Sequence, residues 1–180
     1  NETFYEDVRV PQSQVIGEVN RGWYVGMTLL DYERSNISGA VESRRELERM
    51  LQHTAAGGPE ADKRRPDFDS VRLEVADRYI ETEVGFNFSF RIISMQNRGL
   101  IPNYEASTSK MFASELNQRI QRTGTKVFGL NSQMWDPDDN RSPYGARFTQ
   151  NYFHTIPSTI AGGTSEIQRN IIATRGLGLP

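Results

Sequence analysis

The spacing of apolar residues along the chain changes near position 20. In TFYEDVRVP, apolar and polar residues alternate until Pro11, a pattern that predicts a strand or the end of one. From Trp23 to about Leu51, apolar residues instead recur three, four and seven positions apart, which is typical of one face of a long helix. The chain is therefore expected to leave a short strand and to enter a helical region.

The helical spacing continues toward the C-terminus, interrupted by polar and glycine-rich stretches. It predicts four more helical segments, at about 69–96, 102–129, 148–157 and 164–176. Ser165, with Gln168 three residues later, fits a capping box at the start of the last segment. The fold class indicated is all-α: an antiparallel four-helix bundle with a short N-terminal strand remnant.

Composition excludes several kinds of site. The 180 residues carry a formal net charge of −2, which gives no electrostatic reason to expect nucleic acid or an anionic membrane as a partner. The absence of cysteine excludes disulfides, thiolate nucleophiles and cysteine-based zinc sites. His53 and His154 are the only histidines, so no metal site is expected. Phosphate loops of the GxGxxG or GKS/T type are also absent.

Targeting signals are absent as well. No apolar run is long enough to span a bilayer, and NETFYEDVRVP lacks the basic and apolar regions of a signal peptide. We therefore expect a cytoplasmic protein without a membrane partner. The abrupt start of the chain leads us to expect further sequence upstream.

Two charged residues disturb the apolar face of the first predicted helix. On a helical wheel Arg34 falls inside the apolar stripe and Glu33 lies on its flank. Burying a lone charge is costly, so each must be paired, solvated or used. One interpretation is an arginine whose head reaches water and a glutamate in a salt bridge at the bundle edge. The other is a carboxylate base in an apolar pocket, where desolvation raises its pKa.

Three stretches of the chain resemble the acyl-CoA dehydrogenase family: DVRVPQSQVIGEVNRGW, DYER and GGTSEIQRNIIATRGLGLP. The resemblance covers nearly the whole chain. It implies that residues 1–19 are the end of the middle β domain and its connector, and that residues 20–180 are the C-terminal helical bundle domain. The chain would then be a C-terminal fragment, which we expect to be inactive by itself.

The resemblance also implies an activity. Family members use FAD to introduce an α,β double bond into an acyl-CoA thioester, with a glutamate that removes the α proton. In many members this glutamate precedes the GT of a Y-E-G-T motif, where this chain has Gly162. In a subset it precedes the arginine of a D-x-E-R segment, where Glu33 stands. By resemblance Glu33 is the base, and Asp31, Tyr32 and Arg34 are substrate-binding neighbours.

The glycine pair has a role in the same resemblance. The main-chain N–H of Gly162 would donate to the thioester carbonyl and stabilise the charge that develops there, and Gly163 would lie against the substrate. Thr164, Ser165 and Glu166 would contact FAD at the start of a helix, although Glu166 replaces the more usual glutamine. Helix capping by Thr164 and Ser165 is the simpler interpretation, and both can hold together.

Two departures from the family pattern concern the cofactor. The usual R-x-x-F-G motif is missing. Lys63, Arg64 and Arg65 in its place could substitute for the arginine, but a solvated charge run is the simpler interpretation. The Q-x-F-G-G-N-G turn becomes KVFGLNS, in which Phe128 and Gly129 keep the cofactor-binding turn while Leu130 replaces a glycine. Both changes indicate an altered inter-subunit half of the flavin site.

These features leave three hypotheses. The first is an active acyl-CoA dehydrogenase with Glu33 as its base. The second is a non-catalytic partner subunit in a mixed oligomer. The third is a family member with oxidase- or monooxygenase-type flavin chemistry. The resemblance implies a homo- or hetero-oligomer, a dimer or tetramer formed through the bundle, and electron-transfer flavoprotein as the oxidant.

Overall fold

The computed structural model describes residues 2–33, 37–55 and 68–180, and these are almost entirely helical. The helices are α1 (Gly22–Glu33), α2 (Ile37–Ala55), α3 (Phe68–Asn97), α4 (Tyr104–Phe128), α5 (Arg147–His154) and α6 (Ser165–Ile171). Short 3₁₀ segments lie at Gln12–Gln14, Gly129–Gln133 and Pro157–Thr159, and a π-helical turn covers Ile172–Gly176. The predicted all-α bundle is confirmed.

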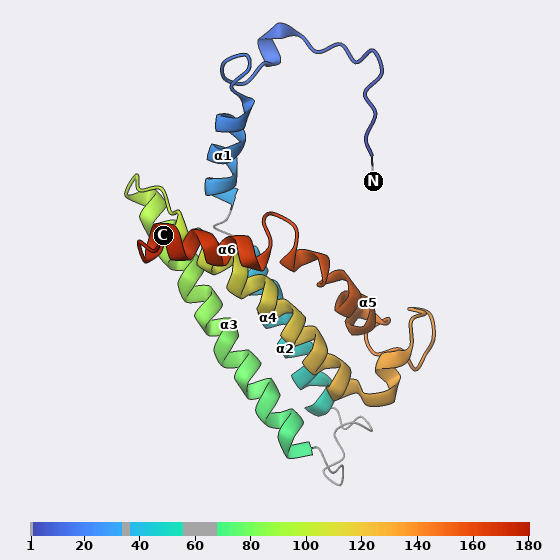
Figure 1. Cartoon of the computed structure of the whole chain (residues 1–180). Coiled ribbons are helices and arrows are strands. Elements are labelled where there is room, and N and C mark those ends of the chain that lie inside the picture. Colours follow the sequence, from blue (N-terminus) through green and yellow to red (C-terminus); the bar gives the residue numbers. More distant parts are fainter. Residues whose placement is uncertain (1, 34–36, 56–67) are drawn as a thin grey trace.

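Helix α4 is at the centre of the bundle (Figure 1). It packs against α2, α3, α5 and α6, while α2 also packs against α3. The chain reverses direction between α2 and α3 and again between α3 and α4, which makes neighbouring long helices antiparallel (Figure 1). One cluster of buried apolar residues forms the core between α2, α4 and α5: Leu47, Met50, Leu116, Ile120, Val127, Phe128 and Phe148.

The predicted N-terminal strand is not formed. The described residues contain no strand, and the chain before Gln12 is irregular. It runs away from the bundle (Figure 1), and Phe4, Val8 and Val10 are each more than 60% exposed. A strand requires a neighbouring strand for its backbone hydrogen bonds, and the described part of the chain offers none. Alternation alone therefore gave a wrong prediction here.

The predicted first helix from Trp23 to Leu51 corresponds to α1 and α2, which flank residues 34–36. Those three residues, including Arg34, lie outside the described residues. Helix α1 stands clear of the bundle (Figure 1). The apolar face predicted for the helix from Trp23 to Leu51 is therefore not packed along the half that α1 forms. Trp23 is 75% exposed and Leu29 is 65% exposed. Only the α2 half of the predicted face contributes to the core.

The C-terminal ends of α3 and α4 agree with the glycine positions in the sequence. The predicted N-cap of α6, in contrast, is wrong. Gly99, with φ +71°, follows α3, and Gly129, with φ +56°, follows α4. The left-handed conformation at both positions is one that glycine adopts without strain. At α6 the N-cap is Thr164 and not Ser165, because the Thr164 hydroxyl accepts the N–H of Ile167 at 3.3 Å. The capping box predicted with Gln168 is therefore wrong by one residue.

None of the helices in the described ranges combines the length and the apolar character that a bilayer span requires. The longest helix, α3, has 30 residues, but charged and polar side chains are distributed along it.

Close packing of α5 on α4 depends on the absence of a side chain at Gly124. A Cβ built there would fall within the ring of Phe148, which is 1% exposed. Gly124→Ala is therefore expected to lower the free energy of unfolding by about 1–3 kcal/mol, the usual cost of overpacking a core. Chemical denaturation followed by circular dichroism measures this change.

The matched control is Gly26→Ala in α1, where a Cβ would have no neighbour within 4 Å. That substitution should leave stability unchanged or raise it by about 0.5–1 kcal/mol, because alanine favours a helix over glycine. Equal effects of the two substitutions would contradict the packing described for α5.

Candidate functional site

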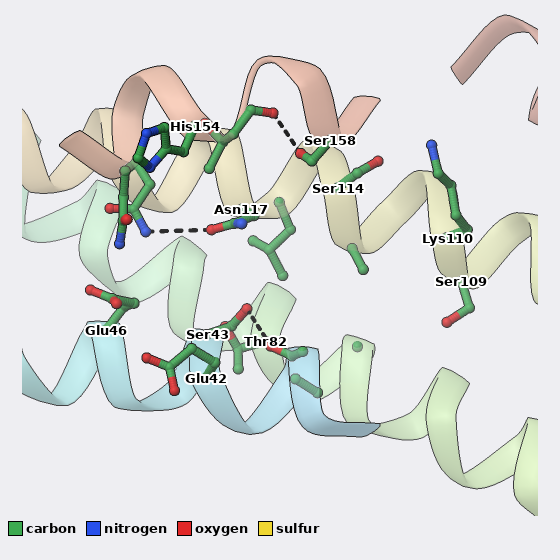
Figure 2. A pocket seen from close by; sticks show the side chains of 18 of the residues that line it. Glu42, Ser43, Glu46, Thr82, Ser109, Lys110, Ser114, Asn117, His154 and Ser158 are labelled. Atoms are coloured by element: carbon green, nitrogen blue, oxygen red, sulfur yellow. Dashed lines mark hydrogen bonds between the residues drawn. The ribbon is translucent and has the colours of Figure 1, made fainter. Parts of the chain in front are cut away.

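A pocket of about 620 Å³ lies between α2, α3, α4 and the segment that runs from α5 to the glycine pair. Figure 2 shows Glu46 at one end of this pocket and Lys110 at the other. Its wall consists largely of small and hydroxyl-bearing side chains. They include Ser43, Thr82, Ser89, Ser109, Ser114, Asn117, Thr155 and Ser158, together with Gly39, Ala40, Gly85 and Ala113.

The Gly162–Gly163 pair forms one end of this pocket and is held by two side chains. Lys110 Nζ donates to the Gly163 carbonyl at 2.7 Å. Gln168 Nε2 donates to the carbonyls of Gly162 at 3.1 Å and Gly163 at 3.3 Å, and Gln168 is fully buried. Both carbonyl oxygens are therefore fixed by side chains from α4 and α6.

The glycines are required by geometry at both positions. Their φ angles are +66° at Gly162 and +93° at Gly163, where side chains cause strain. A Cβ at Gly163 would also come within 2.6 Å of Gln168 Nε2. Two adjacent glycines therefore precede α6 because the backbone turns there in a conformation that other residues rarely adopt.

The last turn of α1 approaches the same pocket. Leu30 is one of the lining residues, as is Gly162, although they are far apart in the sequence. Asp31, Tyr32 and Glu33 complete α1 immediately after Leu30. The positions of their three side chains lie outside what the structure describes. Leu30, one helical turn before Glu33 in α1, and Gly162 therefore line the same pocket.

A second, open groove of about 540 Å³ lies at the start of α6. Three of the predicted cofactor-binding residues line it: Thr164, Ser165 and Glu166. Its other lining residues include the arginines Arg119, Arg122 and Arg169. The Ser165 hydroxyl is buried and has no hydrogen-bond partner within the described residues. This groove thus combines cationic side chains with an unpartnered hydroxyl.

The pKa of the Glu166 carboxyl is lowered in this groove. A hydrogen bond from its own backbone N–H lowers the pKa of its carboxyl, and the Thr164 hydroxyl and the charge of Arg169 lower it further. Arg169 Nη1 lies 3.8 Å from Glu166 Oε1. The arginine compensates part of the negative charge that glutamate introduces where glutamine is usual.

Phe128 and Gly129 lie far from the glycine pair. Eighteen residues of α4 separate Phe128 from Lys110, which corresponds to about 27 Å along the helix. The Phe128 ring is fully buried, with centroids 4.6 Å from His53 and 4.8 Å from Phe148. These two predicted cofactor-binding residues are therefore not brought together with Thr164, Ser165 and Glu166 within one chain.

An ion cluster joins α2 to α5 and was not recognised in the sequence. Arg147 Nε lies 2.6 Å from Glu46 Oε1, and Arg147 Nη2 lies 2.6 Å from Glu42 Oε1. Arg49 Nη1 contacts the same two oxygens at 3.0 and 3.1 Å. The helical spacing of Glu42, Glu46 and Arg49 on one face was the available signal, but Arg147 is about a hundred residues away in the chain.

The two carboxylates of the cluster have opposite pKa shifts. Burial raises the pKa of Glu46, and the hydrogen bond and charge of Arg147 and the charge of Arg49 offset this only in part. Burial also acts to raise the pKa of Glu42, but Arg49, Arg147 and Arg45 together outweigh it and lower the pKa below 4.5. The difference follows from exposure, because the side chain of Glu46 is 3% exposed and that of Glu42 is 43% exposed.

The described part of the chain contains no candidate metal site. No group of three or more histidine, aspartate or glutamate side chains is arranged there to hold an ion.

The opposite shifts predict opposite effects of pH on two variants. The folded chain binds the Glu46 proton more tightly than the unfolded chain does, so stability falls as pH rises from about 4.5 through the raised pKa. Glu46→Gln has no such proton to lose. Its free energy of unfolding, relative to the unmodified chain, should therefore increase over this window.

Glu42→Gln is the matched comparison. The lowered pKa of Glu42 makes its ionised form stabilising, and that stabilisation is lost as pH falls from about 4.5 through the lowered pKa. The variant should therefore be less stable than the unmodified chain above that window, with the difference disappearing in acid. Urea titrations across the pH range measure both trends, and trends of the same sign would contradict the assignment.

Comparisons with known proteins agree with the helical architecture. The model of the family described as "Acyl-CoA dehydrogenase, C-terminal domain" matches residues 20–177. Acyl-CoA dehydrogenase FadE26 of Mycobacterium tuberculosis is 31% identical over 99% of this chain and 45% of its own length. The chain therefore spans about half the length of the curated relatives it matches.

Comparison with solved structures agrees with this family match. The Tcur3481–Tcur3483 steroid ACAD superposes with a TM-score of 0.82 at 26% identity, over 98% of this chain and 44% of the other. A chain of the ChsE4–ChsE5 complex from Mycobacterium tuberculosis gives a TM-score of 0.74 at 28% identity, over 98% and 45%. The fold, the closing motif and the family match together show that the chain belongs to the acyl-CoA dehydrogenase family, whose C-terminal helical domain it contains.

Proposed function

We propose that the protein containing this chain is an FAD-dependent acyl-CoA dehydrogenase, which introduces an α,β double bond into an acyl-CoA thioester with Glu33 as the base. The observation that carries the proposal is the pocket shared by Leu30, at the end of α1, and Gly162. Glu33 follows Leu30 by three residues, about one helical turn, in the same helix. A carboxylate at this place would act on a substrate held beside the glycine pair.

The glycine pair supplies the polar contact for the thioester in this proposal. Because Lys110 and Gln168 fix the carbonyl oxygens of both glycines, the turn is set before substrate binds. The Gly162 main-chain N–H would then donate to the thioester oxygen as negative charge develops there. A preorganised donor of this kind stabilises the developing charge without a reorganisation cost during reaction.

Loss of the carboxylate at Gly162 is consistent with a base at Glu33. Two carboxylates beside one α carbon would raise each other's pKa, whereas a single one ionises more readily. Glu33 would accept the α proton on a carboxyl oxygen. The nearby apolar side chain of Leu30 would limit access of water to that oxygen.

The groove at α6 fits the phosphate-bearing part of FAD in its donor set. Guanidinium groups suit phosphate oxygens, and Arg119, Arg122 and Arg169 all line this groove, where Arg119 also pairs with Glu81 at 3.1 Å and Arg169 with Glu115 at 2.7 Å. The buried, unpartnered hydroxyl of Ser165 and the N-terminal end of α6 lie beside them. These residues would hold the cofactor, which supplies the acceptor for the substrate's β hydride.

Phe128 and Gly129 are assigned to a different FAD, the one bound by a neighbouring chain. Their position at the far end of α4 and the burial of Phe128 leave the backbone of Gly129 and the 88% exposed Leu130 as the contact surface. An oligomer formed through the bundle, with electron-transfer flavoprotein as the oxidant, completes the proposal. Residues 1–19 would be the end of the middle β domain and its connector.

Glu33→Gln in the full-length protein tests the base. Amide nitrogen cannot take the α proton, so the rate of flavin bleaching by acyl-CoA should fall by about 10²–10⁴-fold. The flavin content and the melting temperature should not change. Stopped-flow absorbance under anaerobic conditions measures the rate. Glu48→Gln, at an exposed position of α2, is the control and should bleach normally.

A non-catalytic partner subunit is the second candidate. It is supported by the missing R-x-x-F-G motif and by Leu130, which places a large exposed side chain where the family has a close-approach glycine. Two similar structures also carry the names of two chains, the ChsE4–ChsE5 complex and the Tcur3481–Tcur3483 steroid ACAD. Oxidase-type chemistry remains a third candidate, which rapid reaction of the reduced flavin with oxygen would reveal.

Flavin stoichiometry separates the first two candidates. If this protein is only a partner subunit, the purified full-length chain should contain much less than one FAD per chain and should gain FAD when the second subunit is added. An active homo-oligomer should contain one FAD per chain by itself. Absorbance of the released flavin against protein concentration gives the ratio.

A further inference from the structure

We propose that the pocket beside the glycine pair accepts an acyl group that carries hydroxyl substituents, and not a plain hydrocarbon chain. This inference rests on the proposed function, because it treats the pocket as the acyl site. The reasons lie in the hydrogen-bonding character of the pocket wall, which nothing in the proposed dehydrogenation chemistry requires.

The pocket is large enough for an extended or polycyclic acyl group. Its volume of about 620 Å³ falls within the range of ligand pockets. It follows α4 from Lys110, beside the glycine pair, to Gln121 near the ion cluster. Those residues are eleven positions apart, which corresponds to about 16 Å along the helix. A group at the far end would therefore lie well away from the thioester.

Four hydroxyl groups of the wall have already used their protons. Each donates to a backbone carbonyl of its own helix: Ser43 to Gly39 at 2.9 Å, Thr82 to Arg78 at 2.8 Å, Ser89 to Gly85 at 3.2 Å and Ser114 to Met111 at 3.1 Å. A hydroxyl has one proton and two lone pairs. These four side chains therefore have only acceptor capacity left for a ligand.

The stronger donors around the pocket are engaged as well. Lys110 donates to the Gly163 carbonyl, and Arg147 donates to Glu42 and Glu46. Gln121 Nε2 donates to Asn117 Oδ1 at 3.4 Å. These contacts engage donors at both ends of the pocket, while the side chains of Asn117, Asn151 and His154 also line it. The four hydroxyl oxygens keep their acceptor capacity for a ligand that brings hydroxyl protons.

Two buried oxygens at the deep end lack a donor. Gln121 is 1% exposed and Glu46 is 2% exposed, and both line the pocket. Gln121 Oε1 and Glu46 Oε2 have no hydrogen-bond partner among the described residues. A buried acceptor without a donor costs free energy, which a ligand hydroxyl would recover. These oxygens place the preferred hydroxyl at the end of the acyl group remote from the thioester.

The other two ligand types fit less well. A bare hydrocarbon would desolvate the acceptors of the wall and give nothing in return. A cationic group would find no excess negative charge, because Arg49 and Arg147 already pair with Glu42 and Glu46. A neutral donor, a hydroxyl, matches the pocket best.

The test compares matched CoA thioesters with the full-length protein, together with its partner subunit if it has one. Each pair has the same carbon skeleton, with and without a terminal hydroxyl, over a series of chain lengths. Affinity is measured by isothermal titration calorimetry, and flavin reduction is followed in the same series. At the length that reaches Gln121, the hydroxylated thioester should bind about tenfold more tightly.

Gln121→Leu removes one unpartnered acceptor. The affinity ratio of the hydroxylated to the unsubstituted thioester should then fall from about tenfold to about threefold or less. Gln52→Leu, at an exposed position of α2, is the matched control and should retain the full preference. If Gln121→Leu does not fold, Ser114→Ala provides the second variant, since Ser114 is on the pocket wall and only partly buried. It should lower the preference at the shorter chain length that reaches Ser114, which lies seven positions, about 10 Å, before Gln121 along α4.

The outcomes separate the two proposals. Equal or tighter binding of the unsubstituted thioester at every length would overturn the inference, whether or not flavin is reduced. If no thioester reduces the flavin, the proposed function fails, while the binding ratio still decides for or against a hydroxylated ligand. Preference that survives in Gln121→Leu and Ser114→Ala would likewise overturn the assignment to this pocket.

Discussion

The burial of α4 is the constraint on which the other features depend. This helix contacts α2, α3, α5 and α6, and it supplies four of the seven residues of the buried apolar cluster that forms the core. Phe148 packs over Gly124 at its C-terminal part, and Lys110 reaches the glycine pair from its N-terminal part. One rigid helix thus sets the distance between the core, the pocket and the turn before α6.

The polar contacts add orientation to this apolar framework. Arg147 joins α5 to α2 through Glu42 and Glu46, and Gln168 joins α6 to the turn that precedes it. Neither set is close in sequence to all of its partners. Together they close the pocket at its two ends, with an ion cluster at one and two glycine carbonyls at the other. Between them the wall is built from small side chains, which leaves the space open.

The two groups of proposed cofactor and substrate contacts are separated along α4. Gly162 and the end of α1 line one pocket, whereas Phe128 and Gly129 lie about 27 Å along α4 from Lys110, which holds the glycine pair. Under the proposed function, Phe128 and Gly129 would therefore serve the FAD of a neighbouring chain.

The sequence by itself determined the helices and their ends, because periodicity and glycine positions are local signals: α3, α4 and the caps at Gly99 and Gly129 lie where the pattern predicts them. Its closing motif also identified the family. The tertiary structure decided which faces are buried. It left the first turns of α1 clear of the bundle, did not form the N-terminal strand, and brought Lys110 and Arg147 to partners distant in sequence. Such contacts depend on how helices pack, and no periodicity within one segment encodes them.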